Sequence, residues 1–160
     1  MKKKCIFTIM IVVGVVLLDQ SSKLYIDNVL PLHHSIEILK NFAHVTHVRN
    51  TGAAFGFMSG QVTGIRSLFF LTASIIAIGA ILFILRGLED NRPLIISSLS
   101  MILGGAVGNL IDRVRIGEVI DFVDLHWYSY HWPTFNVADS AITIGGIFLV
   151  IHIAFRKGTF

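Results

Sequence analysis

The sequence has little cysteine and little charge, and each shortage excludes a class of protein. Its only cysteine, Cys5, excludes an internal disulfide and a zinc site built from cysteines. Only 14% of the 160 residues are charged, and the basic ones form no stripe with interleaved aromatics, so nucleic-acid binding has little support. The seven histidines include no His-Glu-x-x-His motif, which argues against a metalloprotease. We expect neither a metal nor another cofactor.

Apolar residues are abundant instead: 54% of the chain is hydrophobic, and the mean hydropathy is +0.74. A water-soluble fold of this length could not bury so much apolar surface, so lipid must solvate part of it. Four apolar segments have about the length that a helix needs to cross a hydrocarbon core of ~30 Å. They are 5–24, 65–86, 93–112 and 138–155. We therefore predict a polytopic membrane protein, mainly α-helical, with residues 1–160 as one membrane-embedded domain.

Basic residues cluster at alternate ends of these spans. The clusters are Lys2, Lys3 and Lys4 before the first span, Arg86 and Arg92 around the second loop, and Arg156 and Lys157 after the fourth span. The positive-inside rule then predicts both termini in the cytoplasm and the segments 25–64 and 113–137 outside. We expect the first span to be an uncleaved anchor and not a removed signal peptide, because no small-x-small cleavage pattern follows it.

Polar residues gather near the outer ends of the spans, although ionisable groups near bilayer depth are costly and therefore candidates for function. The residues that lie roughly 22–30 Å from the basic end of their span, at about 1.5 Å per residue, are Asp19, Lys23, Asp112 and Asp139. Asp19 and Lys23, four residues apart, should form an ion pair that orders the helix end. Asn109, Asp112 and Arg113 share one helical face, as candidate site residues or as an interfacial polar cap.

The outer segments carry weaker signals. Residues 36–39 and 42–49 have β-strand character and could pair as a hairpin, forming a small amphipathic sheet on the membrane surface. The small residues of segment 50–57, Gly52 among them, would permit close backbone approach, so this loop could clamp a peptide from above. The aromatic residues from 127 to 132, with His126 and His131 among them, are typical of an interfacial belt.

Two carboxylates that meet would form the most specific site in this sequence. Asp139 directly precedes the apolar run of the fourth span, with Asn136 three residues before it to orient its carboxylate. Its partner is Asp121 or Asp124, both in the segment that we expect to be a loop. Paired carboxylates share a proton and can activate water, as in aspartic proteases.

Two other classes of protein explain less. A proton-coupled or ion-coupled transporter predicts carboxylates through the bilayer thickness and an inverted repeat, and the sequence has neither. A purely structural subunit leaves the two Asn-x-x-Asp elements, Asn109–Asp112 and Asn136–Asp139, without a reason.

Together these segments resemble the lipoprotein signal peptidase (signal peptidase II) family over nearly the whole chain. The motifs that carry the resemblance, in order, are Asp19-Gln20-x-x-Lys23, Asn50-Thr51-Gly52-Ala53-Ala54-Phe55, Gly108-Asn109-Leu110-Ile111-Asp112-Arg113, Gly117-x-Val119-Ile120-Asp121-Phe122 and Phe135-Asn136-Val137-Ala138-Asp139-Ser140. Five motifs in order are far more specific than any one of them.

The resemblance implies a fold of four transmembrane helices with a small extracytoplasmic β-cradle and a short outer helix. It implies a multi-pass enzyme of the bacterial cytoplasmic (inner) membrane, with its active site near the outer face. That enzyme would cleave prolipoprotein signal peptides before a diacylglyceryl-modified cysteine, so its partners would be these substrates and membrane lipid. The sequence does not determine the oligomeric state, and we expect a monomer.

The resemblance also assigns roles to residues. The catalytic dyad of the family maps onto Asp121 and Asp139, in preference to Asp124. The supporting polar residues of the family map onto Asp19, Lys23, Asn50, Asn109, Asp112, Arg113 and Asn136.

Overall fold

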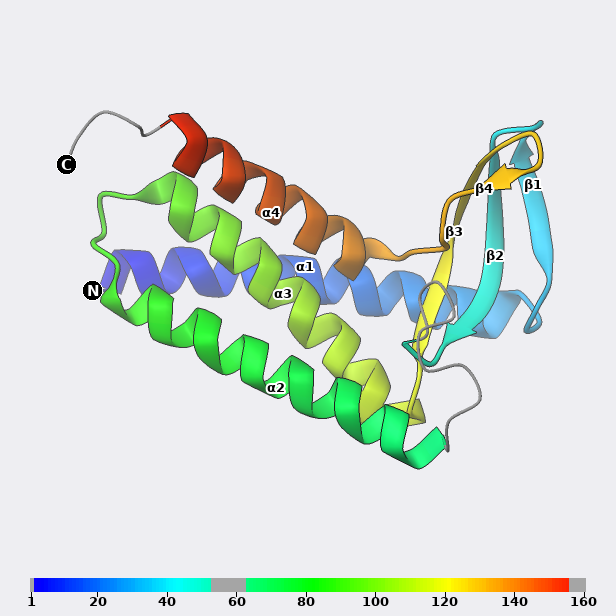
Figure 1. The fold of residues 1–160 in the computed structure, drawn as a ribbon, viewed down its shortest axis with the longest axis horizontal. Coiled ribbons are helices and arrows are strands. Elements are labelled where there is room, and N and C mark those ends of the chain that lie inside the picture. Colours follow the sequence, from blue (N-terminus) through cyan, green and yellow to red (C-terminus); the bar gives the residue numbers. More distant parts are fainter. Residues whose placement is uncertain (1, 53–62, 156–160) are drawn as a thin grey trace.

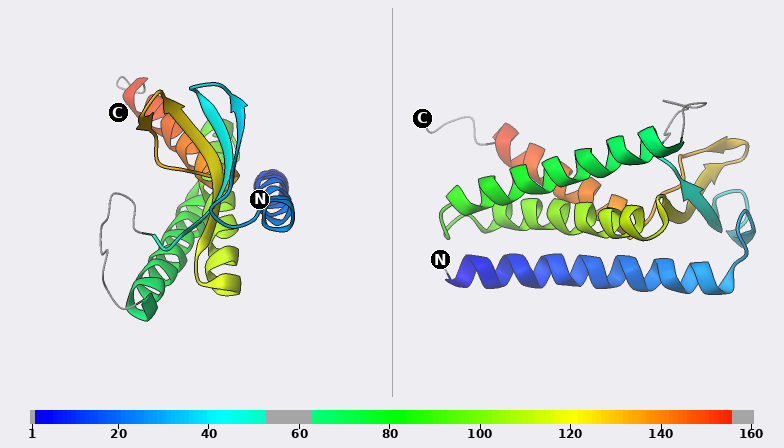
Figure 2. Two further views of the ribbon diagram at one scale, coloured as in Figure 1. Left: turned by 90° about the vertical axis from the view of Figure 1, so that its right-hand side faces the viewer. Right: turned by 90° about the horizontal axis from the view of Figure 1, so that it is seen from below.

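Four long helices and one small antiparallel sheet make up residues 2–52 and 63–155, the part of the chain that this computed structural model describes (Figure 1). In chain order the elements are α1 (Lys2–Val29), β1 (Ser35–Leu39), β2 (Ala43–Asn50), α2 (Thr63–Gly87), α3 (Pro93–Ile116), β3 (Val119–Trp127), β4 (Tyr130–His131) and α4 (Val137–Phe155). The helices lie alongside one another, and the sheet lies across one end of them (Figure 2). All four predicted spans are confirmed as helices long and apolar enough to cross a membrane.

The central helix is α3, which packs against α1, α2 and α4. Half of its most apolar stretch (50%) is buried within the protein, against 6%, 11% and 17% for α1, α2 and α4. Pro93 begins α3, where its missing N–H is not needed. Gly117, in the left-handed region at φ 78°, ends the helix by donating its N–H to the carbonyl of Arg113 at 3.1 Å.

Glycines on α3 let the neighbouring helices approach closely. A Cβ at Gly104 would lie 2.8 Å from the Cβ of Val15 on α1, and one at Gly105 would collide with the carbonyl oxygen of Ala138 on α4. The small-xxx-small spacing of Gly104 and Gly108 thus serves helix packing.

The sheet has the order β1-β2-β3-β4, with every neighbouring pair antiparallel. The predicted hairpin of 36–39 with 42–49 is confirmed as β1 paired with β2. The prediction of a loop from 113 to 137 is wrong in three places: α3 continues to Ile116, 119–127 form strand β3, and 130–131 form strand β4. The β-branched and aromatic residues of this strand pair with β2, although Asp121 and Asp124 interrupt its apolar pattern.

Because side chains alternate along a strand, Asp121 and Asp124 lie on opposite faces of β3. Residues 2–52 and 63–155 contain four helices, α1 to α4, and all of them are long. The short outer helix that the family resemblance implies is not found in this part of the chain.

Candidate active site

A cluster of buried polar side chains lies where α1, α3, α4 and β3 meet. Its members, none more than 6% exposed, are Asp19, Lys23, Asn109, Asp112, Asp121 and Asn136. The prediction that polar residues of different spans reach a common level is therefore confirmed. Buried groups of this kind are tolerated only when they are hydrogen-bonded or paired.

Lys23 is the centre of this cluster. Its Nζ lies 2.8 Å from a carboxylate oxygen of Asp19, 2.8 Å from one of Asp112, and 2.9 Å from the Oδ1 of Asn109. All three ammonium donors thus have an acceptor, which compensates the cost of burying the charge. The predicted Asp19–Lys23 ion pair is confirmed, and Asp112 extends it to a second helix.

Asp19 joins three helices. Its Oδ1 accepts the backbone N–H of Ala138 at 2.9 Å, in the first turn of α4. A Cβ at Gly108 would lie 2.6 Å from its Oδ2, so only glycine leaves room for this carboxylate. Gln20 donates to Asp19 at 3.1 Å, to the carbonyl of Gly108 at 3.1 Å and to Asp112 at 3.0 Å. The sequence analysis missed Gln20 as a site residue, although it belongs to the Asp19–Lys23 motif.

Asn136 bridges Asp121 and Asp139. Its side-chain amide donates to Asp121 Oδ1 at 2.6 Å, while its backbone N–H donates to Asp139 Oδ2 at 3.3 Å. The backbone N–H of Asp139 donates back to Asn136 Oδ1 at 2.9 Å, a reciprocal cap on the first turn of α4. Asn109 Nδ2 donates to the other oxygen of Asp139 at 2.8 Å. Asn136 contacts the Asp139 carboxylate as expected, but through its backbone N–H just before α4 and not across a helix face.

Asp121 is fully buried, whereas Asp139 is partly exposed. Burial raises the pKa of Asp121 to about 7. The hydrogen bonds from Asn50 (2.9 Å) and Asn136 oppose this rise, and the negative charge of Asp139 adds to it. Asp121 therefore keeps a proton up to neutral pH.

Gly52 fixes the orientation of Asn50. Its backbone N–H donates to Asn50 Oδ1 at 2.7 Å, which leaves the Nδ2 of Asn50 to face Asp121. Gly52 has φ 91°, and a Cβ there would collide with the ring of Phe70 on α2, so glycine is required. Of the predicted clamp 50–57, only residues 50–52 lie within the described part of the chain.

Two predicted residues have other partners. Arg113 donates to Ser74 Oγ at 3.3 Å and lies 5.8 Å above the ring of Phe70, so its contacts are with α2. Asp124 lies 2.9 Å from His131 on the far face of the sheet, away from Asn136. The structure thus brings Asp121, and not Asp124, to the bridge that holds Asp139.

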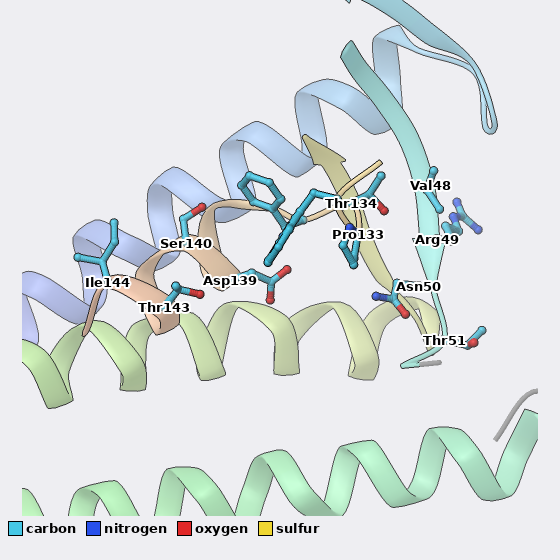
Figure 3. Close-up of a pocket in the computed structure, with 12 residues that line it drawn as sticks. Val48, Arg49, Asn50, Thr51, Pro133, Thr134, Asp139, Ser140, Thr143 and Ile144 are labelled. Carbon is cyan, nitrogen blue, oxygen red and sulfur yellow. The ribbon is translucent and has the colours of Figure 1, made fainter. Parts of the chain in front are cut away.

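A cleft of about 810 Å³ opens beside Asp139. Its lining consists of residues 48–51 at the end of β2, residues 132–135, and Asp139, Ser140, Thr143 and Ile144 of α4. Figure 3 shows Asp139 and Asn50 facing this space from α4 and from the end of β2. The cleft is large enough to hold an extended peptide beside the exposed carboxylate. In residues 2–52 and 63–155, no group of three or more His, Cys, Asp or Glu is arranged to hold a metal ion.

These features define a class of protein: a polytopic membrane protein with two acidic side chains bridged by one asparagine beside an open cleft.

Comparison with known proteins identifies the family within that class. The family model described as signal peptidase (SPase) II matches residues 11–155. The chain is 45% identical over 153 residues to the lipoprotein signal peptidase of Syntrophus aciditrophicus, covering 96% of this chain and 95% of that protein. It is 47% identical over 148 residues to that of Geobacter metallireducens, covering 92% and 90%. A bacterial membrane enzyme solved by the in meso method at 2.3 Å resolution superposes with a TM-score of 0.82 at 34% identity, covering 96% of this chain and 93% of that one.

The chain belongs to the signal peptidase II family, which consists of aspartic-type peptidases. The four apolar helices and the membrane enzymes of similar structure support a multi-pass protein of the bacterial inner membrane.

Proposed function

We propose that this protein removes signal peptides from prolipoproteins by cleaving before a diacylglyceryl-modified cysteine, with Asp121 and Asp139 as its catalytic pair. The observation that carries this proposal is the bridge from Asn136, which contacts both carboxylates at once. Similarity to proteins named lipoprotein signal peptidase supports the choice of substrate.

In the proposed reaction the two carboxylates share one proton, and Asp121, with its pKa of about 7, carries it. The ionised Asp139, at the edge of the cleft, takes a proton from a water molecule as the water oxygen attacks the scissile carbonyl carbon. Asp121 donates its proton to the carbonyl oxygen, which gives a tetrahedral gem-diol. The carbon–nitrogen bond then breaks as the leaving amine takes a proton from Asp139, and one gem-diol hydroxyl returns its proton to Asp121 as the carboxylic acid forms. No covalent acyl-enzyme forms.

The buried cluster holds this pair in position. Lys23 donates to the Oδ1 of Asn109 at 2.9 Å, so the Nδ2 of that amide must face Asp139, where it donates at 2.8 Å. The positive charge of Lys23 balances Asp19 and Asp112 without contacting the pair itself. We therefore assign Lys23 and Asn109 to positioning and not to proton transfer.

The proposed orientation has both termini in the cytoplasm and the sheet on the outer side. The cleft runs from the end of β2 along the first turns of α4, from the sheet end of the helices toward their middle. The lipid chains of a substrate would remain in the bilayer beside α4 while the peptide bond reaches Asp139. Arg113 would hold α2 in place through Ser74, and the clamp 50–57 would contact the substrate. Neither would take part in proton transfer.

The test replaces Asp139 with asparagine and assays cleavage of a lipidated precursor in detergent or liposomes. We expect Asp139→Asn to lower kcat by at least about a thousandfold, because the base is lost while the cap on α4 keeps most of its hydrogen bonds. The matched control is Asp90→Asn, the same chemical change at an exposed position in the α2–α3 connection, far from the sheet (Figure 1). Substantial turnover by a folded Asp139→Asn variant would remove the dyad mechanism.

A further inference from the structure

Three imidazole rings stack across strands β2, β3 and β4, on the face of the sheet opposite Asp121. The ring centroids of His44 and His126 are 4.5 Å apart with an interplanar angle of 6°, and those of His126 and His131 are 4.7 Å apart at 15°. This arrangement, the histidine stack, has no part in the dyad chemistry.

Two carboxylates face the outer rings of the histidine stack. Asp124, on β3, has its oxygens 2.9 and 3.1 Å from His131 Nδ1 and one oxygen 3.6 Å from His44 Nδ1. Glu37, on β1, lies 3.9 Å from His44 Nε2. A proton on either outer ring therefore has a negative charge beside it, in a place where Asp124 is largely buried.

The middle ring differs from the outer two. His126 is only 8% exposed, and its Nδ1 lies 3.0 Å from the carbonyl oxygen of Tyr128, so Nδ1 carries the hydrogen. Its Nε2 is buried without a hydrogen-bond partner, and a proton there would be a buried charge between two other imidazoles. His126 thus separates the two rings that face carboxylates.

The outer rings of the histidine stack belong to segments that lead to the two walls of the cleft. His44 belongs to β2, and residues 48–51, at the far end of that strand, form one wall. His131 directly precedes residues 132–135, which form the other wall and lead into α4. Backbone bonds attach this second wall to β3 at its two ends: Trp132 donates to Leu125 at 2.8 Å, and Phe135 donates to Val123 at 3.1 Å and accepts from Phe122 at 3.1 Å and from Val123 at 2.8 Å.

We propose that the histidine stack positions the 132–135 wall of the cleft, so that the His131–Asp124 pair determines how well substrate binds without affecting the chemical step. This inference rests on the proposed function. The 2.9 Å contact between His131 Nδ1 and Asp124 Oδ1 holds in place the residue that directly precedes this wall.

The experiment compares His131→Phe with the wild-type enzyme, using a lipidated precursor. Phenylalanine preserves the stacked ring but cannot donate to Asp124. We expect KM to rise about fivefold with kcat unchanged. The control is His34→Phe, the same substitution at an exposed histidine outside the stack, which should leave KM unaltered. An unchanged KM in His131→Phe, or a fall in kcat alone, would overturn the proposal.

A second arm needs no activity and so separates this inference from the proposed function. Hydrogen exchange at the backbone amides of Trp132 and Phe135 should be about fivefold faster in His131→Phe than in wild type or His34→Phe. Equal exchange rates in all three proteins would refute the positioning role, even if the enzyme cleaves prolipoproteins as proposed. Faster exchange combined with no cleavage by wild type would leave the positioning of the wall intact and refute the proposed function.

Discussion

Asp121 is the side chain whose chemistry the fold alters most. In an exposed loop its carboxyl group would be ionised at neutral pH, as is usual for aspartate. In β3 it is fully buried, and burial raises its pKa to about 7, although the hydrogen bonds from the amides of Asn50 and Asn136 oppose this rise. The local sequence does not indicate this, because Asp121 and Asp124 occur in similar surroundings, Ile-Asp-Phe and Val-Asp-Leu. The burial comes from α1 and α3, which contact β3, and from Asn50 and Asn136, which donate to the Asp121 carboxyl group.

The pH dependence of turnover follows from the sign of this shift. Below about pH 7 Asp121 holds its proton and can donate it to the carbonyl oxygen; above that pH both carboxylates are ionised and no general acid remains. We expect kcat to fall about tenfold for each pH unit above about 7 to 7.5, measured on a lipidated precursor with the enzyme saturated. A kcat that stays flat up to about pH 9 would show that Asp121 is not the proton donor.

The same shift acts on stability in a defined window. Since the folded state holds the proton of Asp121 and the unfolded state releases it near the ordinary value of 3.8, this group lowers the free energy of unfolding as the pH rises from 3.8 to about 7. This loss of stability is complete above about pH 7, where the buried carboxylate of Asp121 is ionised.

Among the helices, α3 has the most demanding position. It contacts each of the other three helices and carries Asn109 and Asp112 into the buried cluster. The sequence predicted the first residue of α3, Pro93, which follows a short loop. It did not predict the last residue, because Gly117 ends the helix four residues later than the hydropathy indicates. Hydropathy falls at Asp112 because polar residues begin there, while the backbone remains helical until a left-handed residue ends it.

Close packing between α3 and α4 should be sensitive to a single methyl group. Gly105→Ala places a Cβ against the carbonyl oxygen of Ala138, one residue before Asp139, and should destabilise the protein by about 1–3 kcal/mol and reduce activity. Gly79→Ala is the matched control in α2, where an added Cβ meets nothing within 4 Å, and it should be neutral or stabilising by about 0.5–1 kcal/mol. The midpoint of thermal unfolding in detergent measures both, and equal midpoints would contradict the close contact.

Strand β3 shows where pattern reading fails. A strand buried on both faces at one end and open at the other has no regular alternation, and 119–121 are all buried whereas Trp127 is exposed. The β1–β2 hairpin was predictable because its two segments are adjacent in sequence. Strand β3 pairs with β2, which lies far from it in the sequence; Asn50 and Asp121, which are hydrogen-bonded, are 71 residues apart. A local sequence pattern cannot predict such a distant partner.

The sheet lies at one end of the helices, and the basic residues of the chain start and of the α2–α3 connection lie at the other end. The α2–α3 connection lies at the opposite end of the helices from the sheet (Figure 1). Large apolar side chains along the outer surfaces of the helices are exposed, which suits contact with lipid. The proposed orientation in the bilayer rests on the basic residues near Lys4 and Arg92.

The only cysteine makes this orientation easy to test. In a Cys5→Ser background, we expect a membrane-impermeant maleimide to label Tyr130→Cys, at the exposed tip of the sheet, in intact spheroplasts. Asn91→Cys, in the α2–α3 connection, should be labelled only after the membrane is permeabilised. The reverse labelling pattern would place the sheet in the cytoplasm and contradict the proposed topology.

The sequence by itself determined the four apolar helices, their order, the level at which Asp19, Lys23, Asp112 and Asp139 lie, and the family, because hydropathy and motif spacing are local properties of a chain. Only the tertiary structure decided that Asn136 bridges Asp121 and Asp139, that Asp124 lies on the other face, and that three histidines stack across β2, β3 and β4. These contacts join groups as far apart as Asp19 and Ala138, 119 residues along the chain, and their energies depend on burial, which exists only once the helices and the sheet have packed.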